Sequence, residues 1–488
     1  MSVNASQLIA ELRTDFEALL NMVTGAEAQT ASLNQMERSL LRQLLRMGRK
    51  LLQVFLASRA EAESHAPHWG WQRWKLAYHS QKSVDYVSVF GKVEVTRAYF
   101  YAPGYGGKTP LDRALSLPER CYSDLLMECA ELLAVDSAYD KAAQVLARLL
   151  GVEMSVLAIE NAVAEHSPAV LTFYAQREAV PHREEGRILV AQADGKGVPL
   201  VRDEAPPLKV RRGKGDKKTR KKEAIAVALY TIAPYRRSPQ QVVAALFRED
   251  DPPPERPVPQ HKHVFASLDG KAVALRRLAR WAVKRDGLHI RHHVALTDGA
   301  EALQDQMRQQ LPNFTLVLDI IHVVEYLWAA GTALYGETDP QRAEWVQTQT
   351  LDILSSHTEQ VIQRLEEKAS AWSPTSPAAK ALRRVAGYLQ RNRPYMDYAR
   401  YLKNGWPIGT GVVEGTCRHL VKDRMERSGM RWTLAGAEAL LALRAIQENG
   451  DWDAFHQFRR QRRHKQLYGK PLIETWIDPV ERLEINQV

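Results

Sequence analysis

Apolar residues recur along this chain with two different periods. In residues 1–65 they fall three or four positions apart, which is the spacing of one face of an α-helix. Residues 66–118 instead contain a β-rich stretch, 86–101, interrupted by Gly91, a residue typical of a hairpin turn. We therefore predict two N-terminal helices, which either pack on the body of the protein or pair with another subunit, and a small β-hairpin region after them.

Helical spacing returns in residues 119–180. A predicted helix that begins at Tyr139 leads to Gly151, and Ser155 is then placed to cap a second helix. Two helices joined in this way are typical of a helix-turn-helix, whose second helix can enter the major groove of DNA. The same pattern fits a plain helical hairpin about as well, so the sequence leaves both interpretations open.

Strands and helices alternate in residues 181–322. The spacing predicts strands at 188–193, 223–232, 241–247, 292–297 and 314–318, and helices at 271–284 and 300–311. A mostly helical insertion, residues 323–404, would separate this part from its completion in residues 405–450, and a basic tail, residues 451–488, follows. Three strands in succession, then helix, strand, helix and strand, is the element order of a ribonuclease H-like fold.

The predicted fold class is therefore α/β. It consists of a ribonuclease H-like core around a mixed five-stranded sheet, with a helical insertion, and a helical and small-β N-terminal region that would bind DNA. The 488 residues are enough for roughly two to four domains.

Three acidic residues occupy positions in this predicted core where they could bind catalytic metal ions. Asp194 is predicted to end the first strand, Asp298 to end the fourth, and Glu414 follows a glycine-rich turn that begins at Gly405. Carboxylate oxygens are the ligands that Mg²⁺ prefers, and two such ions can activate an attacking oxygen and stabilise a leaving one on a phosphodiester. The structural alternative is that each aspartate, because a glycine follows it, forms a turn, and that Glu414 caps a helix.

The composition favours a polyanionic partner. The chain has 67 Lys and Arg against 57 Asp and Glu, a net charge of +10. Its three cysteines are too few for a disulfide framework, which fits a reducing compartment. We expect no signal peptide and no membrane span, since no apolar stretch approaches 18 residues.

Positive charge is densest in residues 209–222. Nine of these fourteen residues are basic: Lys209, Arg211, Arg212, Lys214, Lys217, Lys218, Arg220, Lys221 and Lys222. Such a loop is predicted to follow DNA phosphates with a salt-dependent affinity. A second basic run, 459–465, is interpreted by default as a solvated helix end, with a DNA-binding arm as the alternative.

Five short motifs occur in a specific order. They span Gln192–Pro199, Leu296–Gly299, Asp319–His322, Pro407–Glu414 and Arg424–Trp432. Together they resemble DDE transposases of bacterial insertion sequences, specifically the ISKra type, which are distantly similar to Mutator-like enzymes. The resemblance extends from about residue 92 to residue 448.

This resemblance implies the roles of individual residues. Asp194, Asp298 and Glu414 would be catalytic and would hold Mg²⁺, with Mn²⁺ as a substitute. Asp319 also ends a predicted strand and is the alternative second aspartate; Asp298 is favoured because the fourth strand lies beside the first in such a sheet. His322 would support the site.

The resemblance also implies partners. Double-stranded DNA, as element ends and target, would be contacted by the basic loop and by Arg418, Arg424, Arg431 and Trp432. The protein would act as a dimer or higher oligomer, in the bacterial cytoplasm at the nucleoid. No nucleotide cofactor is expected, and no zinc, since residues 101–107 lack the cysteines that related enzymes place there. The implied activity is DNA cleavage and strand transfer; the alternatives are a nuclease without strand transfer and a DNA-binding regulator derived from a transposase.

Overall fold

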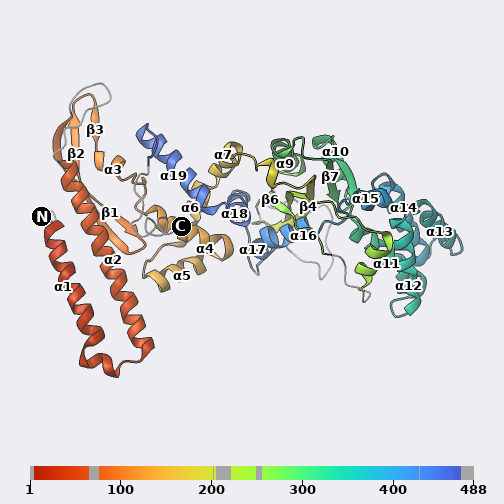
Figure 1. The fold of residues 1–488 in the computed structure, drawn as a ribbon, viewed down its shortest axis with the longest axis horizontal. Coiled ribbons are helices and arrows are strands. Elements are labelled where there is room, and N and C mark those ends of the chain that lie inside the picture. Colours follow the sequence, from red (N-terminus) through yellow and green to blue (C-terminus); the bar gives the residue numbers. More distant parts are fainter. Residues whose placement is uncertain are drawn as a thin grey trace. The chain divides into compact units, whose positions relative to one another are not determined.

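The computed structural model describes residues 5–64, 76–201, 203–204, 221–248, 255–427 and 429–473. The chain divides into two compact units (Figure 1). The first contains Met1–Ala169 and Trp452–Val488, and the second contains Val170–Asp451. Seven basic residues of the predicted DNA-binding loop lie outside the described residues: Lys209, Arg211, Arg212, Lys214, Lys217, Lys218 and Arg220.

The first unit begins with an antiparallel helical hairpin, as the apolar spacing predicts. It consists of α1 (Ala5–Thr24), a short 3₁₀ helix (Ala26–Thr30) and α2 (Leu33–Ser64). The backbone N–H of Ala5 donates to Glu61 at one end of the hairpin, and the Ser39 hydroxyl donates to Met22 Sδ nearer the other. The two predicted N-terminal helices are confirmed.

A small sheet packs on α2. Its strands are β1 (Ala77–Ser88), β2 (Gly91–Ala102) and β3 (Gly106–Lys108), all antiparallel. Gly91 has φ of +99°, a conformation that glycine adopts without strain, so the predicted turn is confirmed. Val93 and Val95 of β2 pack against Leu56 of α2. Gln53 also exchanges two hydrogen bonds with the backbone of Glu94, which fixes the helix to the strand.

Five further helices lie in the first unit, and a sixth leads out of it. They are α3 (Pro110–Ala114), α4 (Asp124–Asp136), α5 (Tyr139–Leu150), α6 (Val156–His166) and α19 (Trp452–Tyr468), and α7 (Pro168–Gln176) continues into the second unit. Gly151 ends α5 at φ of +67°, and the Ser155 hydroxyl accepts from Ala158 N to cap α6. The helix-glycine-helix pattern is thus confirmed, and it remains compatible with either a helix-turn-helix or a plain hairpin.

The basic run 459–465 lies in α19 and is largely turned inward. Asp124 of α4 accepts hydrogen bonds from both Arg459 and Arg463, and Arg459 is only 6% exposed. Glu131, which is also in α4 and is fully buried, pairs with His166 of α6. The interpretation of this run as a solvated helix end is therefore wrong for Arg459 and Arg463, because the partly buried Asp124 of α4 pairs with both.

The second unit is built on a mixed five-stranded sheet, as predicted. Its strands are β4 (Ile188–Pro199), β5 (Lys221–Ile232), β6 (Gln260–Ser267), β7 (His292–Thr297) and β8 (Thr315–Leu318). They lie in the order β6-β5-β4-β7-β8, with β4, β5 and β6 antiparallel and β4, β7 and β8 parallel.

The predicted third strand, 241–247, is wrong. These residues form α8 (Pro239–Phe247), which starts at a capping box between Ser238 and Gln241 with Pro239 in its first turn. A short apolar run fits both a strand and a buried helix, and the cap decides between them here. The actual third strand, β6, escapes the apolar signal because it is an edge strand that begins with the exposed residues 260–262.

Helices cover both faces of this sheet (Figure 1). α9 (Lys271–Arg285) and α10 (Glu301–Gln310) pack on the face formed by Leu189, Ala191 and Ala295. α11 (Ile320–Tyr335) packs on the opposite face, which carries Val190 and Leu296. Successive strand residues point to opposite faces, so even-numbered positions of β4 and β7 share the face of α11.

The remaining helices of the second unit belong to the predicted insertion and to the part that follows it. They are α12 (Pro340–Leu354), α13 (Thr358–Ser370), α14 (Pro377–Asn392), α15 (Tyr398–Asn404), α16 (Gly411–Thr416), a π-helical segment (Cys417–Lys422), α17 (Asp423–Met425) and α18 (Leu434–Glu448), with 3₁₀ turns at His182–Glu184 and Arg393–Tyr395. Among the described residues, no helix combines the length and apolar character that a membrane crossing needs.

Candidate active site

Asp194 and Asp298 lie level with each other on adjacent parallel strands. Gln192 of β4 pairs with Leu296 of β7, and each aspartate comes two residues later. Adjacent strands lie about 4.8 Å apart, and the charge of Asp298 acts on the pKa of Asp194. Asp194 is an even-numbered residue of β4, so its side chain shares the sheet face that packs on α11. Asp298 follows the end of β7, and its charge acts on the pKa of His322 in α11.

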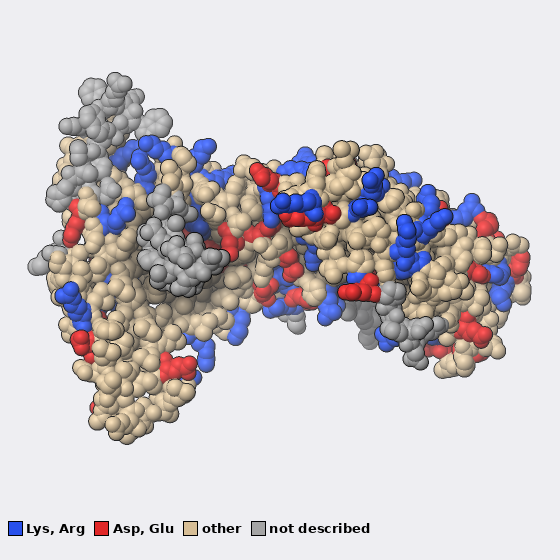
Figure 2. Space-filling view, viewed as in Figure 1, with Lys and Arg blue, Asp and Glu red and all other residues tan. Residues whose placement is uncertain are grey.

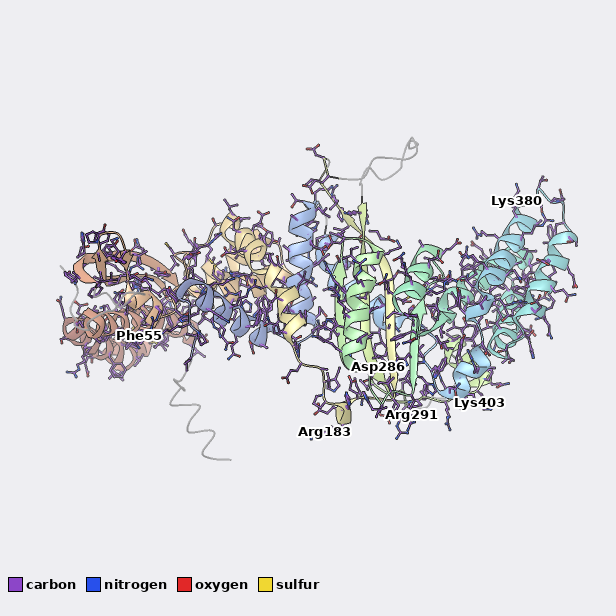
Figure 3. The ribbon with its side chains drawn as sticks, turned by 90° about the horizontal axis from the view of Figure 1, so that it is seen from above. Phe55, Arg183, Asp286, Arg291, Lys380 and Lys403 are labelled. Carbon is purple, nitrogen blue, oxygen red and sulfur yellow. The ribbon has the colours of Figure 1, made fainter. Side chains whose placement is uncertain are left out.

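The two aspartates differ in their position relative to the ends of their strands. Asp298 directly follows β7, as predicted. Asp194 does not end its strand, which is a correction: β4 continues to Pro199 and stays paired with β5, and only its pairing with β7 stops at Gln192. Figure 3 labels Asp286 and Arg291 at the end of the sheet where β7 begins, so Asp298 lies at the opposite end.

A glycine-containing segment places Glu414 over the same face. Gly405 ends α15 at φ of +74°, and a Cβ there would come within 2.5 Å of Tyr235 N, so this position requires glycine. From this turn the chain runs to α16, which carries Glu414. Glu414 is exposed, and its N–H donates to the carbonyl of Thr410.

The fully buried Gln192 fastens this segment to the sheet. Its Nε2 donates to Tyr230 Oη (3.0 Å) and to the Gly409 carbonyl (3.3 Å), and its Oε1 accepts from Val413 N (2.9 Å). Gln192 therefore determines where the backbone one residue before Glu414 lies relative to Asp194.

Replacing Gln192 with leucine is expected to loosen this attachment. The change keeps the volume but leaves the Gly409 carbonyl and the Val413 N–H buried without their partner, at a cost of about 2–3 kcal/mol of unfolding free energy. Chemical denaturation measures this loss. The control is Gln309→Leu on an exposed part of α10, which should stay within about 0.5 kcal/mol of the parent. Equal stability of both variants would mean that Gln192 does not hold the segment.

Asp319 is the most deeply buried carboxylate of the site. It is 0% exposed and caps α11, with Oδ1 accepting from Ile321 N (3.0 Å). Its Oδ2 lies 2.9 Å from His322 Nδ1 and 2.6 Å from Thr410 Oγ1. The strand end predicted at Asp319 is confirmed, but both carboxylate oxygens already have hydrogen-bonding partners.

Thr410 joins this cluster to Glu414. Its Oγ1 lies 2.8 Å from Glu414 Oε1 as well as 2.6 Å from Asp319 Oδ2. A hydroxyl group has a single proton to donate, so it can satisfy only one of the two carboxylates at a time. The other carboxylate oxygen then faces a lone pair, an arrangement that a proton or a cation beside it would relieve.

Asp319, His322 and Glu414 could together hold a metal ion, because one ligand atom from each lies within 4.8 Å of the others. In the absence of a metal, the hydrogen bond to Asp319 raises the pKa of His322 to about 9, which outweighs the opposing effect of burial. His322 is then a cation beside Asp319 and would have to lose a proton before it could bind a metal.

At Asp194, burial has a larger effect on the pKa than the hydrogen bonds do. Burial raises its pKa, and the charge of Asp298 adds to that effect, while hydrogen bonds from Cys417 and Gly195 partly offset it. The Cys417 thiol, whose own pKa burial raises, donates to Asp194 Oδ2 at 3.3 Å. The ionised form of Asp194 is thus disfavoured in the folded protein, mainly by burial.

The helical insertion holds the strand ends that carry the aspartates. Tyr388 of α14 donates to the Asp298 carbonyl (3.1 Å), and Tyr398 of α15 donates to the Leu318 carbonyl (2.9 Å). Gly299 has φ of +92°, and a Cβ there would approach Tyr388 Oη to 2.7 Å, so a glycine must follow Asp298. Sequence reasoning missed these tyrosines and also Gln192, Thr410 and Cys417, because each acts through a partner remote in the chain.

The predicted DNA-contacting residues differ in their solvent exposure. Arg418 and Arg431 are exposed. Arg424 is only 1% exposed and lies over the ring of Trp432, which is itself 8% exposed and donates to the Met425 carbonyl. The prediction that Arg424 and Trp432 contact DNA is therefore corrected: this pair packs inside the second unit and shapes the chain between α17 and α18.

The described end of the predicted basic loop is already partnered. Lys221 of β5 pairs with Glu426, and Lys222 lies next to it in the strand. Lys221 therefore fixes the start of β5 near the chain that follows Glu414.

One protein family matches part of the chain. Residues 27–222 match the model of the Uncharacterised protein family (UPF0236). The matched range contains Asp194 and its surrounding strand but stops before Asp298, Asp319, His322 and Glu414. No curated protein matches the sequence.

Proposed function

We propose that this protein is a Mg²⁺-dependent DNA transposase that cleaves and joins DNA at the ends of an insertion sequence. Two observations carry the proposal: the charge of Asp298 acts on the pKa of Asp194, and Gln192, two residues before Asp194, binds the segment that carries Glu414. The strand order β6-β5-β4-β7-β8, with three antiparallel strands and then two parallel ones, supports the ribonuclease H-like core that the proposal assumes.

The donor set fits a hard divalent cation. Asp194 and Asp298 offer carboxylate oxygens, and the described residues donate no hydrogen bond to Asp298 Oδ2. Glu414 is exposed and shares the Thr410 proton with Asp319. Burial raises the pKa of Asp194, so a cation bound beside its carboxylate would stabilise the ionised form, and oxygen ligands favour Mg²⁺ or Mn²⁺ over softer metals. Bound in a pair, such ions polarise the phosphodiester and activate the attacking oxygen.

The chain's own residues would prepare this site. Gln192 and Gly405 fix the backbone that carries Glu414, and Tyr388 fixes the strand end that carries Asp298. Asp319 would position His322 and Thr410 from inside the protein. The protonated His322 would face the negative charge that gathers on the reacting phosphate.

Exposed basic residues are proposed to contact DNA. Arg418 and Arg431 are exposed, and together with the basic loop they would contact DNA phosphates. Cleavage and joining would use the same carboxylates in turn, first with water and then with a DNA 3′-hydroxyl as the attacking group. Cleavage and joining would take place in the bacterial cytoplasm, at the nucleoid.

The test is a cleavage and strand-transfer assay on DNA that flanks the protein's own coding sequence. With Mg²⁺ and a target plasmid, we expect both nicked ends and products in which the ends are covalently joined to the target; EDTA should abolish both. Cleavage without joined products would favour a ribonuclease H-like nuclease. Binding in a gel shift without any cleavage, in Mg²⁺ or Mn²⁺, would favour a DNA-binding regulator derived from a transposase.

A further inference from the structure

The α1–α2 hairpin carries an unusual share of the exposed apolar surface. Of the 24 large apolar side chains that are exposed among the described residues, eight lie in this hairpin: Ile9, Phe16, Leu20, Leu33, Leu41, Leu44, Leu51 and Phe55. Figure 2 shows a face of the hairpin on which few charged side chains gather, and Figure 3 labels Phe55 on the hairpin. Exposed apolar patches of this kind mark interaction sites.

The apolar positions on α2 follow the repeat of a coiled coil. Leu33, Leu40, Leu44, Met47 and Leu51 are separated by seven, four, three and four residues, so they form one line along the helix. Leu33 is 83% exposed, and Leu44 and Leu51 are 55% and 57% exposed. This alternation of three and four places a seam against another helix. We call these five residues the α2 seam.

The faces of α2 that pack within the unit lie elsewhere. One contacts α1, through Lys50 with Asp15 and through Ser39 with Met22. Another contacts β2, through Gln53. At about 100° per residue, the α2 seam lies about 110° around the helix axis from the line of contact with α1, so it is a third face.

The exposed stripe on α1 lies on the same side of the hairpin as the α2 seam. Ile9, Phe16 and Leu20 lie about 90° around the axis of α1 from its contact with α2. Both rotations have the same sense, and the two helices are antiparallel, so both stripes turn toward one side. The hairpin thus presents a two-helix apolar surface.

Charge restricts what can cover this surface. Four exposed arginines, Arg38, Arg42, Arg46 and Arg49, also form a row on α2, but they lie about 130–170° around the helix from the seam. Glu37 is the single charged residue in line with the seam, and the exposed Arg13 lies in line with the stripe on α1. A surface with one residue of each sign does not fit DNA, and the row of arginines on α2 would not repel a second copy across it. It fits an apolar helical surface of the same kind.

We infer that the apolar side of the α1–α2 hairpin is the interface of a homodimer, in which the hairpins of two copies pack as a bundle of four helices. A two-fold symmetric interface uses the same patch on both copies, and interdigitated seam residues are how such bundles bury their cores. The inference does not depend on the proposed function. It leaves the arginine rows of both copies facing outward.

The test is the mass of the full chain in solution, measured by sedimentation equilibrium or light scattering without DNA. We expect a dimer at micromolar concentration. Leu44→Glu with Leu51→Glu should weaken association by about 100-fold or more, because each replaces a leucine that the dimer would bury with a charge. The matched control is Arg42→Glu with Arg46→Glu on the opposite side of the same helix, which should remain a dimer.

A second variant guards against a folding defect. Leu33→Glu changes a seam side chain that is 83% exposed, so the hairpin should keep its helical circular dichroism while the protein becomes monomeric. A monomeric parent protein would overturn the inference and would mean that another part of the same chain covers the surface. A dimer that persists in both apolar variants would overturn it as well, by placing the interface elsewhere.

Discussion

Asp194→Asn is expected to lower Mg²⁺-dependent DNA cleavage at least about a hundredfold, since losing even an outer partner of a metal ligand costs 10–100-fold. Asparagine keeps the shape of the side chain but removes the anionic oxygen that the cation requires. DNA binding should survive or tighten, because one negative charge fewer faces the phosphates. The measurement pairs a gel shift with product analysis in Mg²⁺ on the same samples.

The same variant has a signature that needs no DNA. Burial and Asp298 raise the pKa of Asp194, so the folded protein without a cation is destabilised by ionised Asp194 at neutral pH. Asp194→Asn should therefore unfold at an equal or higher temperature than the parent in EDTA. Mg²⁺ should stabilise the parent and leave the variant unchanged. The control is Asp305→Asn, a surface change on α10, which should respond to Mg²⁺ as the parent does. Cleavage by Asp194→Asn at the parent rate would exclude Asp194 as a ligand.

Asp319→Asn is expected to destabilise the protein by about 2–4 kcal/mol, the range for losing a helix cap together with a buried charged hydrogen-bond acceptor. Both oxygens of Asp319 accept hydrogen bonds, and an amide NH₂ in place of either one would face another donor. Asp298→Asn should stay within about 1 kcal/mol of the parent, because Oδ1 can still accept from Ala300 N. Urea unfolding measures both.

This pair of variants decides which aspartate is the second ligand. Asp298→Asn should lose stabilisation by Mg²⁺ while folding normally. The assignment would be reversed if Asp319→Asn folded with parent stability and lost its response to Mg²⁺ while Asp298→Asn kept it. In that case the cluster of Asp319, His322 and Glu414 would be the metal site.

Local patterns along the chain were sufficient to predict most of the core. Regular spacing identified four of the five strands, and β7 lies beside β4 as expected. The failure at 241–247 has a local cause, since the six apolar residues 242–247 fit both periods and the helix cap lies before them. β6 was missed because an edge strand with an exposed polar start does not alternate between apolar and polar residues.

The candidate site was predictable only as far as residue type and position within elements allow. The placement of Asp298 and Asp319 followed from strand ends, whereas the continuation of β4 beyond Asp194 depends on pairing with β5. The supporting contacts of Gln192 with Val413 and of Thr410 with Asp319 join residues 221 and 91 positions apart. Spacing along a chain carries no signal for such pairs. Burial explains the correction at Arg424, whose basic side chain lies over Trp432 instead of facing solvent.

The central claim is that Asp194, Asp298 and Glu414 together hold divalent cations. Anomalous scattering from crystals soaked in Mn²⁺ tests it most directly, because the ion itself is located. We predict manganese peaks within about 2.0–2.4 Å of carboxylate oxygens of Asp194, Asp298 and Glu414. A single peak bound by Asp319 and His322, with Asp194 left without metal, would contradict the claim.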